Sequence, residues 1–257
     1  MKALTVCALL VSFAAFADSP FDGTWVAKDE SMTLDQKPYV FSLASGVFEN
    51  KTAVPPYKVK ADGTDQPVKG HATFDTVAVK SDAPDSLTTS VKKADKAMGG
   101  STYSVSADGK TLTQKWSDQS GTEAASGENI YTRVGPGPKG AHAASGSWRL
   151  TKSQNTSANA RTLTYKSTAD GMSFSAPTGQ SYTAKFDGKE VPIAGDPAGT
   201  TVSLKKVNAS SFIETDHVKG KVVEVDHWTV APDGKTMKME WERKDSGRKG
   251  SVVFDRQ

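Results

Sequence analysis

Residues 106–116, SADGKTLTQKW, return 125 positions later as residues 231–241, APDGKTMKMEW. The likeness extends without a gap over residues 57–116 and 182–241, in which 17 of 60 aligned positions are identical. Most of the shared positions are turn residues, such as Asp62-Gly63, or aromatic residues, and few are reactive side chains. A repeat that keeps its turns is typical of a duplicated fold, so we expect two copies of one structural unit.

Short stretches in which apolar and polar residues alternate lie between the turns, as in residues 112–116 and 237–241. Alternation of this kind predicts strands, and no window shows the sustained apolar period of a helix. The repeated Asp-Gly pairs are typical of tight hairpin turns, because glycine accepts the positive φ that such turns need. We count about eight or nine short strands in each copy. The sequence therefore predicts an all-β protein with two tandem antiparallel β-barrel or sandwich domains.

The boundary between the copies is marked by a run of glycine and proline over residues 135–145. Alternating glycine and proline can continue neither a strand ladder nor a helix. We therefore expect one β domain over residues 18–134, a linker over residues 135–145 and a second β domain over residues 146–257.

The first 17 residues have the pattern of a secretory signal peptide, with a cation at Lys2, an apolar run over residues 3–16 and small residues at Ala15 and Ala17. We expect cleavage near Ala17 and export to the periplasm or the extracellular space. The apolar run is shorter than the ~20 residues that a membrane span needs, so no membrane span is expected. Cys7 is the only cysteine of the chain and lies in this segment, so the mature protein would contain no thiol.

Charge and motifs exclude several classes of function. The net charge is +3, and neither half has the basic stripe of a nucleic-acid-binding protein, so we expect no nucleic-acid partner. The chain contains no G-x-S-x-G, H-E-x-x-H, C-x-x-C or phosphate-loop motif. We therefore assign no catalytic residue, no metal ligand and no cofactor, and the sequence names no protein partner.

Each copy opens with Gly-x-Trp, at Gly23-Thr24-Trp25 and Gly146-Ser147-Trp148, and closes with an arginine two residues after an aromatic residue, at Arg133 and Arg256. This pattern resembles the lipocalin and calycin superfamily, in which an arginine of the last strand crosses the first-strand tryptophan and plugs one end of a β-barrel. The tandem arrangement also resembles duplicated secreted bacterial proteins of lipocalin-like type, which as a family carry no agreed activity. The resemblance implies that the two tryptophans and the two arginines close the ends of two barrels by stacking.

Around the duplicated Asp-Gly-Lys-Thr turn, alternate residues form an aromatic and apolar strand face. The interior of a small barrel is either filled by its own side chains or holds one small ligand. Such a face is usually a packed core, but methionines and amphipathic aromatic residues also adapt to bound molecules. If a ligand binds, the candidate residues are Tyr103, Trp116, Trp228, Met237, Met239 and Trp241.

The second copy alone carries Glu214-Thr215-Asp216-His217 and Glu224-Val225-Asp226-His227 around a turn at Lys219-Gly220. A two-residue hairpin loop would place Thr215 opposite Glu224, and His217, Glu224 and Asp226 on one face. Such a cluster could bind a metal or transfer protons. Charged residues on one face of a half-exposed hairpin are also ordinary, and we interpret the cluster as a solvated outer face.

These observations favour an exported, non-enzymatic protein that binds a small apolar ligand inside a β-barrel. We expect the ligand in the second barrel first, because Gln114 of the first copy is replaced there by Met239. A buried glutamine beside an apolar ligand is costly unless it is hydrogen-bonded. The alternative is a structural or interaction module of the cell envelope, in which both barrels are packed solid and bind no ligand.

Overall fold

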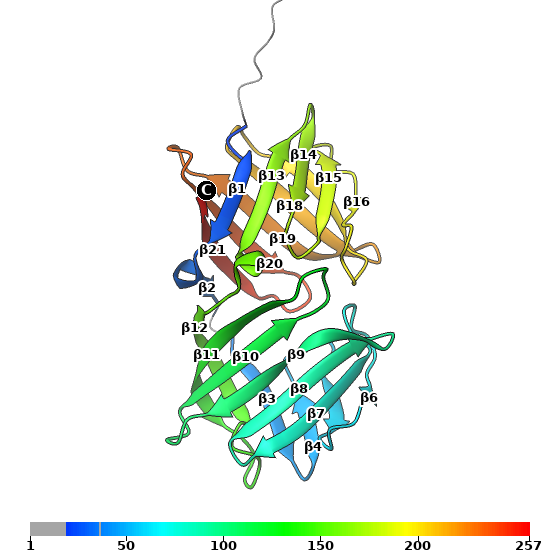
Figure 1. Cartoon of the computed structure of the whole chain (residues 1–257), viewed down its shortest axis with the longest axis vertical. Coiled ribbons are helices and arrows are strands. Elements are labelled where there is room, and N and C mark those ends of the chain that lie inside the picture. Colours follow the sequence, from blue (N-terminus) through cyan, green and yellow to red (C-terminus); the bar gives the residue numbers. More distant parts are fainter. Residues whose placement is uncertain (1–18, 36) are drawn as a thin grey trace, which may run out of the picture.

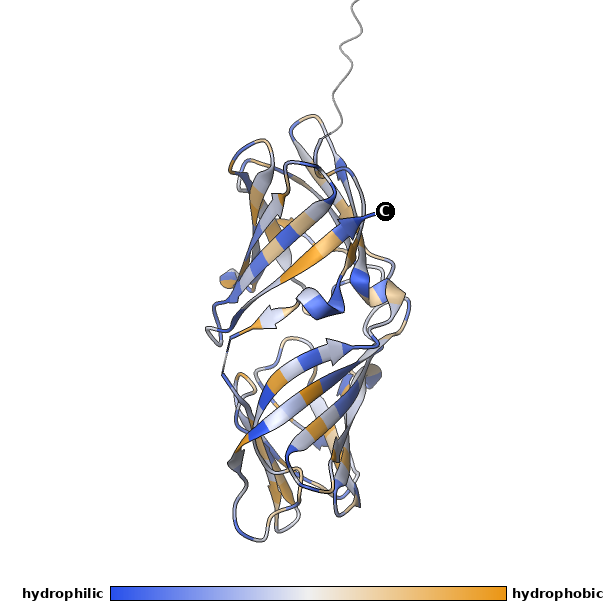
Figure 2. Ribbon diagram, turned by 90° about the vertical axis from the view of Figure 1, so that its left-hand side faces the viewer, coloured by the Kyte–Doolittle hydropathy of each residue, from blue (hydrophilic) through white to orange (hydrophobic). Residues whose placement is uncertain are grey.

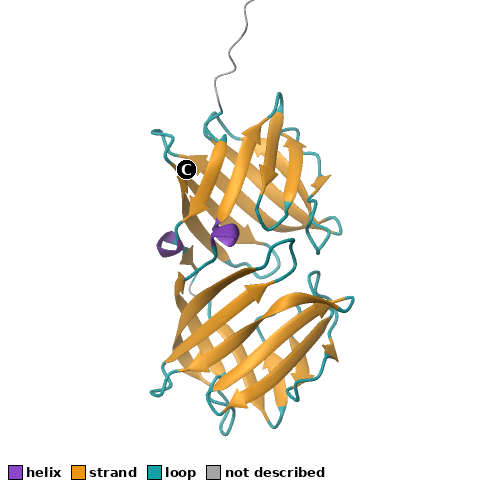
Figure 3. Cartoon of the chain, viewed as in Figure 1, coloured by secondary structure: helices purple, strands orange, loops and turns teal. Residues whose placement is uncertain are grey.

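The computed structural model describes residues 19–35 and 37–257. The chain forms two antiparallel sheets, and each nearly closes into a barrel (Figure 1). The prediction of an all-β protein with two tandem barrels is confirmed. In the described residues, helix is confined to the 3-10 turn η1 (Asp29–Ser31) and the single turn α1 (Ala158–Arg161) (Figure 3). The predicted signal peptide, residues 1–17, lies outside the described residues.

The first barrel contains ten strands in the spatial order β5-β4-β3-β12-β11-β10-β9-β8-β7-β6. Backbone contacts between Gly63 and Val79, and a bridge between Asp62 and Lys80, bring its two edges together. Its strands are β3 (Tyr39–Ala44), β4 (Val47–Asn50), β5 (Tyr57–Lys60), β6 (Gln66–Pro67), β7 (Thr76–Ala83), β8 (Ser86–Lys93), β9 (Lys96–Val105), β10 (Thr111–Asp118), β11 (Ala125–Pro136) and β12 (Gly146–Gln154).

The second barrel has the matching order β15-β14-β13-β1-β21-β20-β19-β18-β17-β16. Its edges meet where Ser181 bridges Ala194. The strands are β1 (Gly23–Ala27), β13 (Thr162–Ser167), β14 (Gly171–Ser175), β15 (Ser181–Lys185), β16 (Val191–Pro192), β17 (Thr201–Lys206), β18 (Ser211–Val218), β19 (Lys221–Val230), β20 (Thr236–Arg243) and β21 (Lys249–Arg256), and the short strand β2 (Thr33–Leu34) pairs with β21.

The two barrels exchange their first strands. Strand β1 opens the first copy in sequence but lies in the second barrel, where Trp25 pairs with Leu163 and with Arg256. Strand β12 opens the second copy but lies in the first barrel, between β11 and β3. Each barrel therefore contains nine strands of one copy and the Gly-x-Trp strand of the other, and the second barrel also takes the short strand β2 of the first copy.

This exchange corrects the predicted domain boundary. Strands β11 and β12 are neighbours in the same sheet, so the glycine- and proline-rich run 135–145 belongs to a hairpin of the first barrel and does not link two domains. The chain crosses between barrels at residues 28–38 and 155–161 instead. The glycine and proline run turns the chain back on itself, and the Gly-x-Trp strand pairs with the strand that precedes it.

The cores follow from the alternation of side chains along the strands (Figure 2). In the first barrel, buried residues such as Phe41, Leu87 and Leu112 form one cluster. In the second barrel, Tyr165, Phe212 and others form a separate cluster. The two cores are not continuous, so each barrel is stabilised by its own buried apolar surface.

One end of each barrel is closed by a stacked arginine and tryptophan, as the sequence resemblance implied, but the partners come from different copies. The Arg133 guanidinium lies 3.9 Å from the ring centroid of Trp148, and that of Arg256 lies 4.4 Å from the ring centroid of Trp25. Both arginines also donate from Nε to the glycine carbonyl of the duplicated Asp-Gly turn, Gly109 at 2.6 Å and Gly234 at 2.7 Å. The turn is conserved between the copies because it forms part of this closure.

The other ends of the barrels face each other. The Thr122 amide donates to the Thr178 carbonyl at 2.9 Å, and Lys93 Nζ donates to the Pro197 carbonyl at 2.6 Å. In Figure 1 the two barrels lie one above the other along the long axis of the molecule. The closed ends therefore point outward, and the open ends meet in the middle.

Candidate ligand-binding chamber

A chamber of about 990 Å³ lies where the two open ends meet. Its first-barrel wall comes from strands β8–β10, the end of β4 and the loop residues 70–74. Its second-barrel wall comes from the loop at 196–200, from β18 and β19, and from the turn that follows β20. The volume falls within the range of small-molecule sites.

The first-barrel wall of the chamber is aromatic. Phe74 and His71 stack with ring centroids 4.3 Å apart, and Tyr57 meets the His71 ring edge-on at 5.5 Å. Tyr103 and Trp116, two of the predicted ligand-binding residues, line the same wall. Burial lowers the pKa of His71, so its imidazole is neutral at neutral pH. This wall offers ring faces and no fixed charge.

Below this wall the polar groups of the first barrel satisfy one another. The Gln114 amide donates to Ser101 Oγ at 2.9 Å and to the Tyr103 hydroxyl at 3.2 Å. Its carbonyl oxygen accepts from the Tyr131 hydroxyl at 2.8 Å and from Asn129 Nδ2 at 3.1 Å. We expected a buried glutamine here to be costly unless it is hydrogen-bonded. Gln114 is hydrogen-bonded through both its amide nitrogen and its carbonyl oxygen, and it belongs to a neutral network.

The second-barrel wall is acidic. Asp216 of β18 and Glu224 of β19 pair across the two strands and line the chamber. One step further into the barrel, Glu214 pairs with Asp226, and both are buried. The four carboxyl groups form a ladder of two pairs that runs from the chamber into the barrel. We call Glu214, Asp216, Glu224 and Asp226 the acid ladder.

A β-bulge produces this arrangement and corrects the predicted register. His217 lies opposite Val222 as expected, but the bulge between Asp216 and His217 places Asp216, instead of Thr215, opposite Glu224. His217 is thereby separated from the acids, and its Nε2 lies 3.8 Å from Glu190 Oε1. The interpretation of Glu224 and Asp226 as part of a solvated outer face is wrong, since Asp226 is only 7% exposed.

Sequence reasoning missed Glu214 and Asp216, although a signal for them was present. Phe212, Glu214 and Asp216 are spaced two residues apart on β18, as are Asp226 and Trp228 on β19. Residues two apart on a strand point to the same face of the sheet, so these acids share the face of the large apolar side chains. The positions matching the acid ladder in the first copy are Thr89, Val91, Gly99 and Ser101, so the ladder belongs to the second barrel alone.

Burial changes the ionisation of the acid ladder. Burial and, to a smaller extent, the neighbouring Glu214 together raise the pKa of Asp226 to about 9. Burial raises the pKa of Glu214 to about 8, against the opposing effect of hydrogen bonds from Tyr182 and Tyr165. The pKa of Asp216 is raised to about 7, first by burial and then by Glu224. The deeper pair is therefore largely protonated at neutral pH, while Asp216 is close to half-ionised. Burial also raises the pKa of Glu224, against the opposing effect of Arg243.

The nearest cation is already engaged. Arg243 binds both carboxylate oxygens of Asp245, at 3.2 and 2.9 Å, and its Nη1 lies 3.5 Å from Glu224. Over the residues that the structure describes, no lysine or arginine comes within ion-pair distance of the other three acids, Glu214, Asp216 and Asp226. Arg248 and Lys221 also line this wall, but Arg248 pairs with Asp35 at 3.6 Å and Lys221 is exposed to solvent. Among the described residues, the Asp216 carboxyl group of the chamber wall therefore has no ion-pair partner.

Unpartnered polar atoms gather around this chamber. Buried side-chain atoms without a hydrogen-bond partner include His71 Nε2, Asp216 Oδ1 and Ser246 Oγ, all from residues that line it. Asp226 Oδ1 and Trp228 Nε1, deeper in the second barrel, are also unpartnered. Most buried polar groups in proteins are paired, so such a concentration at one place indicates a site that another molecule completes.

The remaining predicted ligand-binding residues lie away from the chamber. Trp228 and Met237 are buried in the core of the second barrel, and Met239 packs against that core. Trp241 lies across Gly250 of β21, where an added Cβ would approach the indole to 2.4 Å. Of the six residues, the structure thus brings Tyr103 and Trp116 to the chamber and places the other four in or beside the second core.

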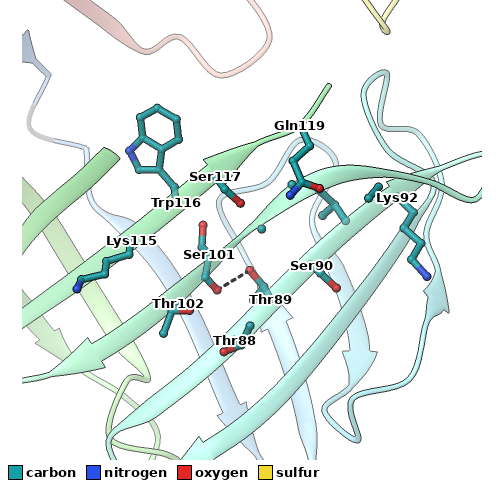
Figure 4. A pocket seen from close by; sticks show the side chains of 14 residues that line it. Thr88, Thr89, Ser90, Lys92, Ser101, Thr102, Lys115, Trp116, Ser117 and Gln119 are labelled. Carbon is teal, nitrogen blue, oxygen red and sulfur yellow. Dashed lines mark hydrogen bonds between the residues drawn. The ribbon is translucent and has the colours of Figure 1, made fainter. Parts of the chain in front are cut away.

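A smaller hollow of about 410 Å³ lies on strands β8–β10 (Figure 4). Short side chains with hydroxyl groups, such as Thr88, Ser90 and Thr102, line it together with Gly99 and Gly100. Trp116 stands at its edge, clear of the hydroxyl groups. The hollow is less than half the volume of the chamber and has no buried charge, so it is the weaker candidate for a binding site.

Over the described residues, no group of three histidine, cysteine, aspartate or glutamate side chains is arranged to hold a metal ion. No helix in this part of the chain is long and apolar enough to cross a membrane. Comparison of the chain with family models, curated proteins and solved structures returns no match. The geometry of the chamber is therefore the basis for a functional assignment.

Proposed function

We propose that the protein captures a small molecule, without covalent chemistry, in the chamber between its two barrels. The unpartnered buried polar atoms of His71, Asp216 and Ser246 around one cavity of about 990 Å³ carry this proposal. The aromatic first-barrel wall suits an apolar body, for which burial contributes about 25 cal/mol per Å² of apolar surface. The expected ligand thus keeps the apolar character inferred from the sequence.

The lipocalin-like resemblance and the signal-like N-terminal segment support a role outside the cytoplasm, in the periplasm or the extracellular space. We also propose that the ligand first contacts the second barrel, because the carboxyl groups that line the chamber all come from that barrel. The alternative, an envelope interaction module without a ligand, is favoured by the well-packed cores of both barrels.

Binding of a neutral apolar dye tests the proposal. N-phenylnaphthylamine should bind the full-length protein saturably, with one dye per chain, and should quench tryptophan fluorescence because Trp116 borders the chamber. The substitution Ala198→Trp, in the chamber loop, should block binding by filling the cavity. Ala107→Trp, in an exposed turn at the closed end of the first barrel, is the matched control and should bind normally. Equal binding to both variants would refute the chamber as the site.

A further inference from the structure

We propose that the ligand of the chamber is a compact organic cation with an aromatic or apolar body, whose positively charged head is bound by Asp216 and Glu224. Amines, guanidines and quaternary ammonium compounds belong to this class. The inference rests on the proposed function, since it names the ligand class of the same site.

The position of the acid ladder supports this assignment. Asp216 and Glu224 line the chamber directly, so a ligand there lies next to both side chains. Glu214 and Asp226 stand behind them, followed by the paired aromatic residues Phe212 and Trp228. These two deeper carboxyl groups are largely protonated at neutral pH, and they would attract a cation at the outer pair only as they ionise at higher pH.

The charge balance points to a missing cation. Arg243 is held by Asp245 in a two-pronged ion pair, and it approaches the ladder only at Glu224. Buried carboxylates are normally paired with a cation or hydrogen-bonded on every oxygen. Asp216 Oδ1 and Asp226 Oδ1 have neither kind of partner. An ammonium or guanidinium group would supply both the charge and the hydrogen-bond donors.

The aromatic wall opposite the ladder fits the other part of such a ligand. Tyr57, Phe74, Tyr103 and Trp116 present rings from the first barrel, and none of them adds charge. Aromatic faces also attract cations, with a contribution of about 0.5–2 kcal/mol for a desolvated contact. An anionic ligand would meet Asp216 at one end, where Arg243 and Arg248 are already paired with Asp245 and Asp35, and uncharged rings at the other. The two walls together select a molecule with one positive end and one apolar end.

Ionisation of the ladder makes binding dependent on pH. A bound cation favours the ionised carboxyl groups, so binding releases protons and the affinity rises between about pH 6 and about pH 9. The titrating groups are Asp216, Glu214 and Asp226, with pKa values raised to about 7, 8 and 9. The other groups that face them are Glu224 on β19, Tyr165 on β13, Tyr182 on β15, Arg243 on β20, and Asp196 and Asp245 in the loops.

Three probes of similar size and different charge test the inference on the full-length protein. Phenethylamine is cationic, phenethyl alcohol is neutral and hydrocinnamate is anionic. We expect phenethylamine to bind at least about tenfold more tightly than the alcohol, and hydrocinnamate to bind least tightly.

In the variant Asp216→Asn/Glu224→Gln, the preference for the amine should disappear while N-phenylnaphthylamine still binds. Glu240→Gln, which removes one carboxylate on the outer side of β20, is the control for a general loss of negative charge and should keep the preference.

The outcomes separate this inference from the proposed function. Equal affinities for the amine and the alcohol, or tighter binding of hydrocinnamate, would overturn the cation assignment and leave the chamber as a neutral site. Absence of binding by all probes, including N-phenylnaphthylamine, would overturn both. If the double variant does not fold, the pH dependence of binding to the unchanged protein tests the inference. Benzyltrimethylammonium, which has a fixed charge, should bind more tightly at about pH 9 than at about pH 6, and a flat profile would refute the inference.

Discussion

Asp226 shows how strongly the interior of the second barrel changes the chemistry of a single residue. An exposed aspartate is ionised throughout the physiological range, but burial and the neighbouring acids raise the pKa of Asp226 from 3.8 to about 9. The side chain is only 7% exposed, and its Oδ1 has no hydrogen-bond partner. A bound cation would stabilise the ionised form of this buried carboxyl group. Without a ligand, the buried group lowers the stability of the protein.

The stability of the protein should therefore fall as the pH rises. Between the unfolded pKa of 3.8 and the folded pKa of about 9, the folded state holds a proton on Asp226 that the unfolded state has released. The free energy of unfolding should decrease over this window by about 1.4 kcal/mol per pH unit for this group. Asp226→Asn should remove this slope, so the variant should gain stability relative to the unchanged protein at high pH. Urea denaturation at several pH values measures it.

Glu240→Gln provides the control for this prediction, because Glu240 lies on the exposed outer side of β20 and pairs with Lys238. Its substitution should leave the pH dependence of the unfolding free energy unchanged. If Asp226→Asn and Glu240→Gln give the same slope as the unchanged protein, the proposed protonation of Asp226 in the folded state is incorrect.

Gln114 illustrates the opposite case, a buried polar residue whose groups are all paired. Gln114→Met copies the residue found at the matching position of the second barrel, Met239. It should leave the Tyr131 hydroxyl and the Asn129 amide without an acceptor, at a cost of about 1–3 kcal/mol. Met239→Leu should cost less than about 1.5 kcal/mol, because it preserves volume and breaks no hydrogen bond. Similar losses in the two variants, measured by denaturation, would contradict this account of the network.

At the scale of the element, the closed end of each barrel is a single unit of three parts: the Gly-x-Trp strand, the last-strand arginine and the Asp-Gly turn. Arg133 donates to three backbone carbonyls, those of Gly109, Ser145 and Ala143. Arg133→Ala should leave these carbonyls and the Trp148 ring without their partner and lower the unfolding free energy by about 2–4 kcal/mol. Arg149→Ala, exposed on the next strand, should change it by less than about 0.5 kcal/mol. A thermal melt of both variants distinguishes them.

The sequence could predict these elements well because their signals are local. Alternation in residues 237–241 and the Asp-Gly turns follow directly from strand and turn chemistry, and the structure has strands and turns at those places. The bulge at Asp216 could not be predicted in the same way. It depends on how β18 pairs with two neighbours at once, and a shift by one residue changes which side chains face inward. For this reason the acid ladder emerged only from the structure.

At the scale of the whole molecule, the exchange of β1 and β12 had no signal in the sequence. Both strands carry Gly-x-Trp, and both fit against an arginine of a last strand, so either could complete either barrel with the same contacts. The choice depends on the connections from β2 to β3 and from β12 to β13, at which the chain passes into the other barrel. As a consequence, cutting the chain near residue 140 would separate each barrel from its first strand.

Engineered disulfides test the exchange. Val26 of β1 pairs with Asp255 of β21, and paired residues on antiparallel strands have Cα atoms about 4.5–5.5 Å apart, within reach of a disulfide. In a chain with Cys7→Ser, the pair Val26→Cys/Asp255→Cys should therefore form an intramolecular crosslink. Arg149→Cys/Asp255→Cys is the matched pair for barrels without exchange, because Arg149 follows Trp148 as Val26 follows Trp25. Non-reducing gel mobility and mass spectrometry after mild oxidation should detect the first crosslink and not the second. The reverse result would show that each barrel keeps its own first strand, and a chamber between two intertwined barrels would then need to be reconsidered.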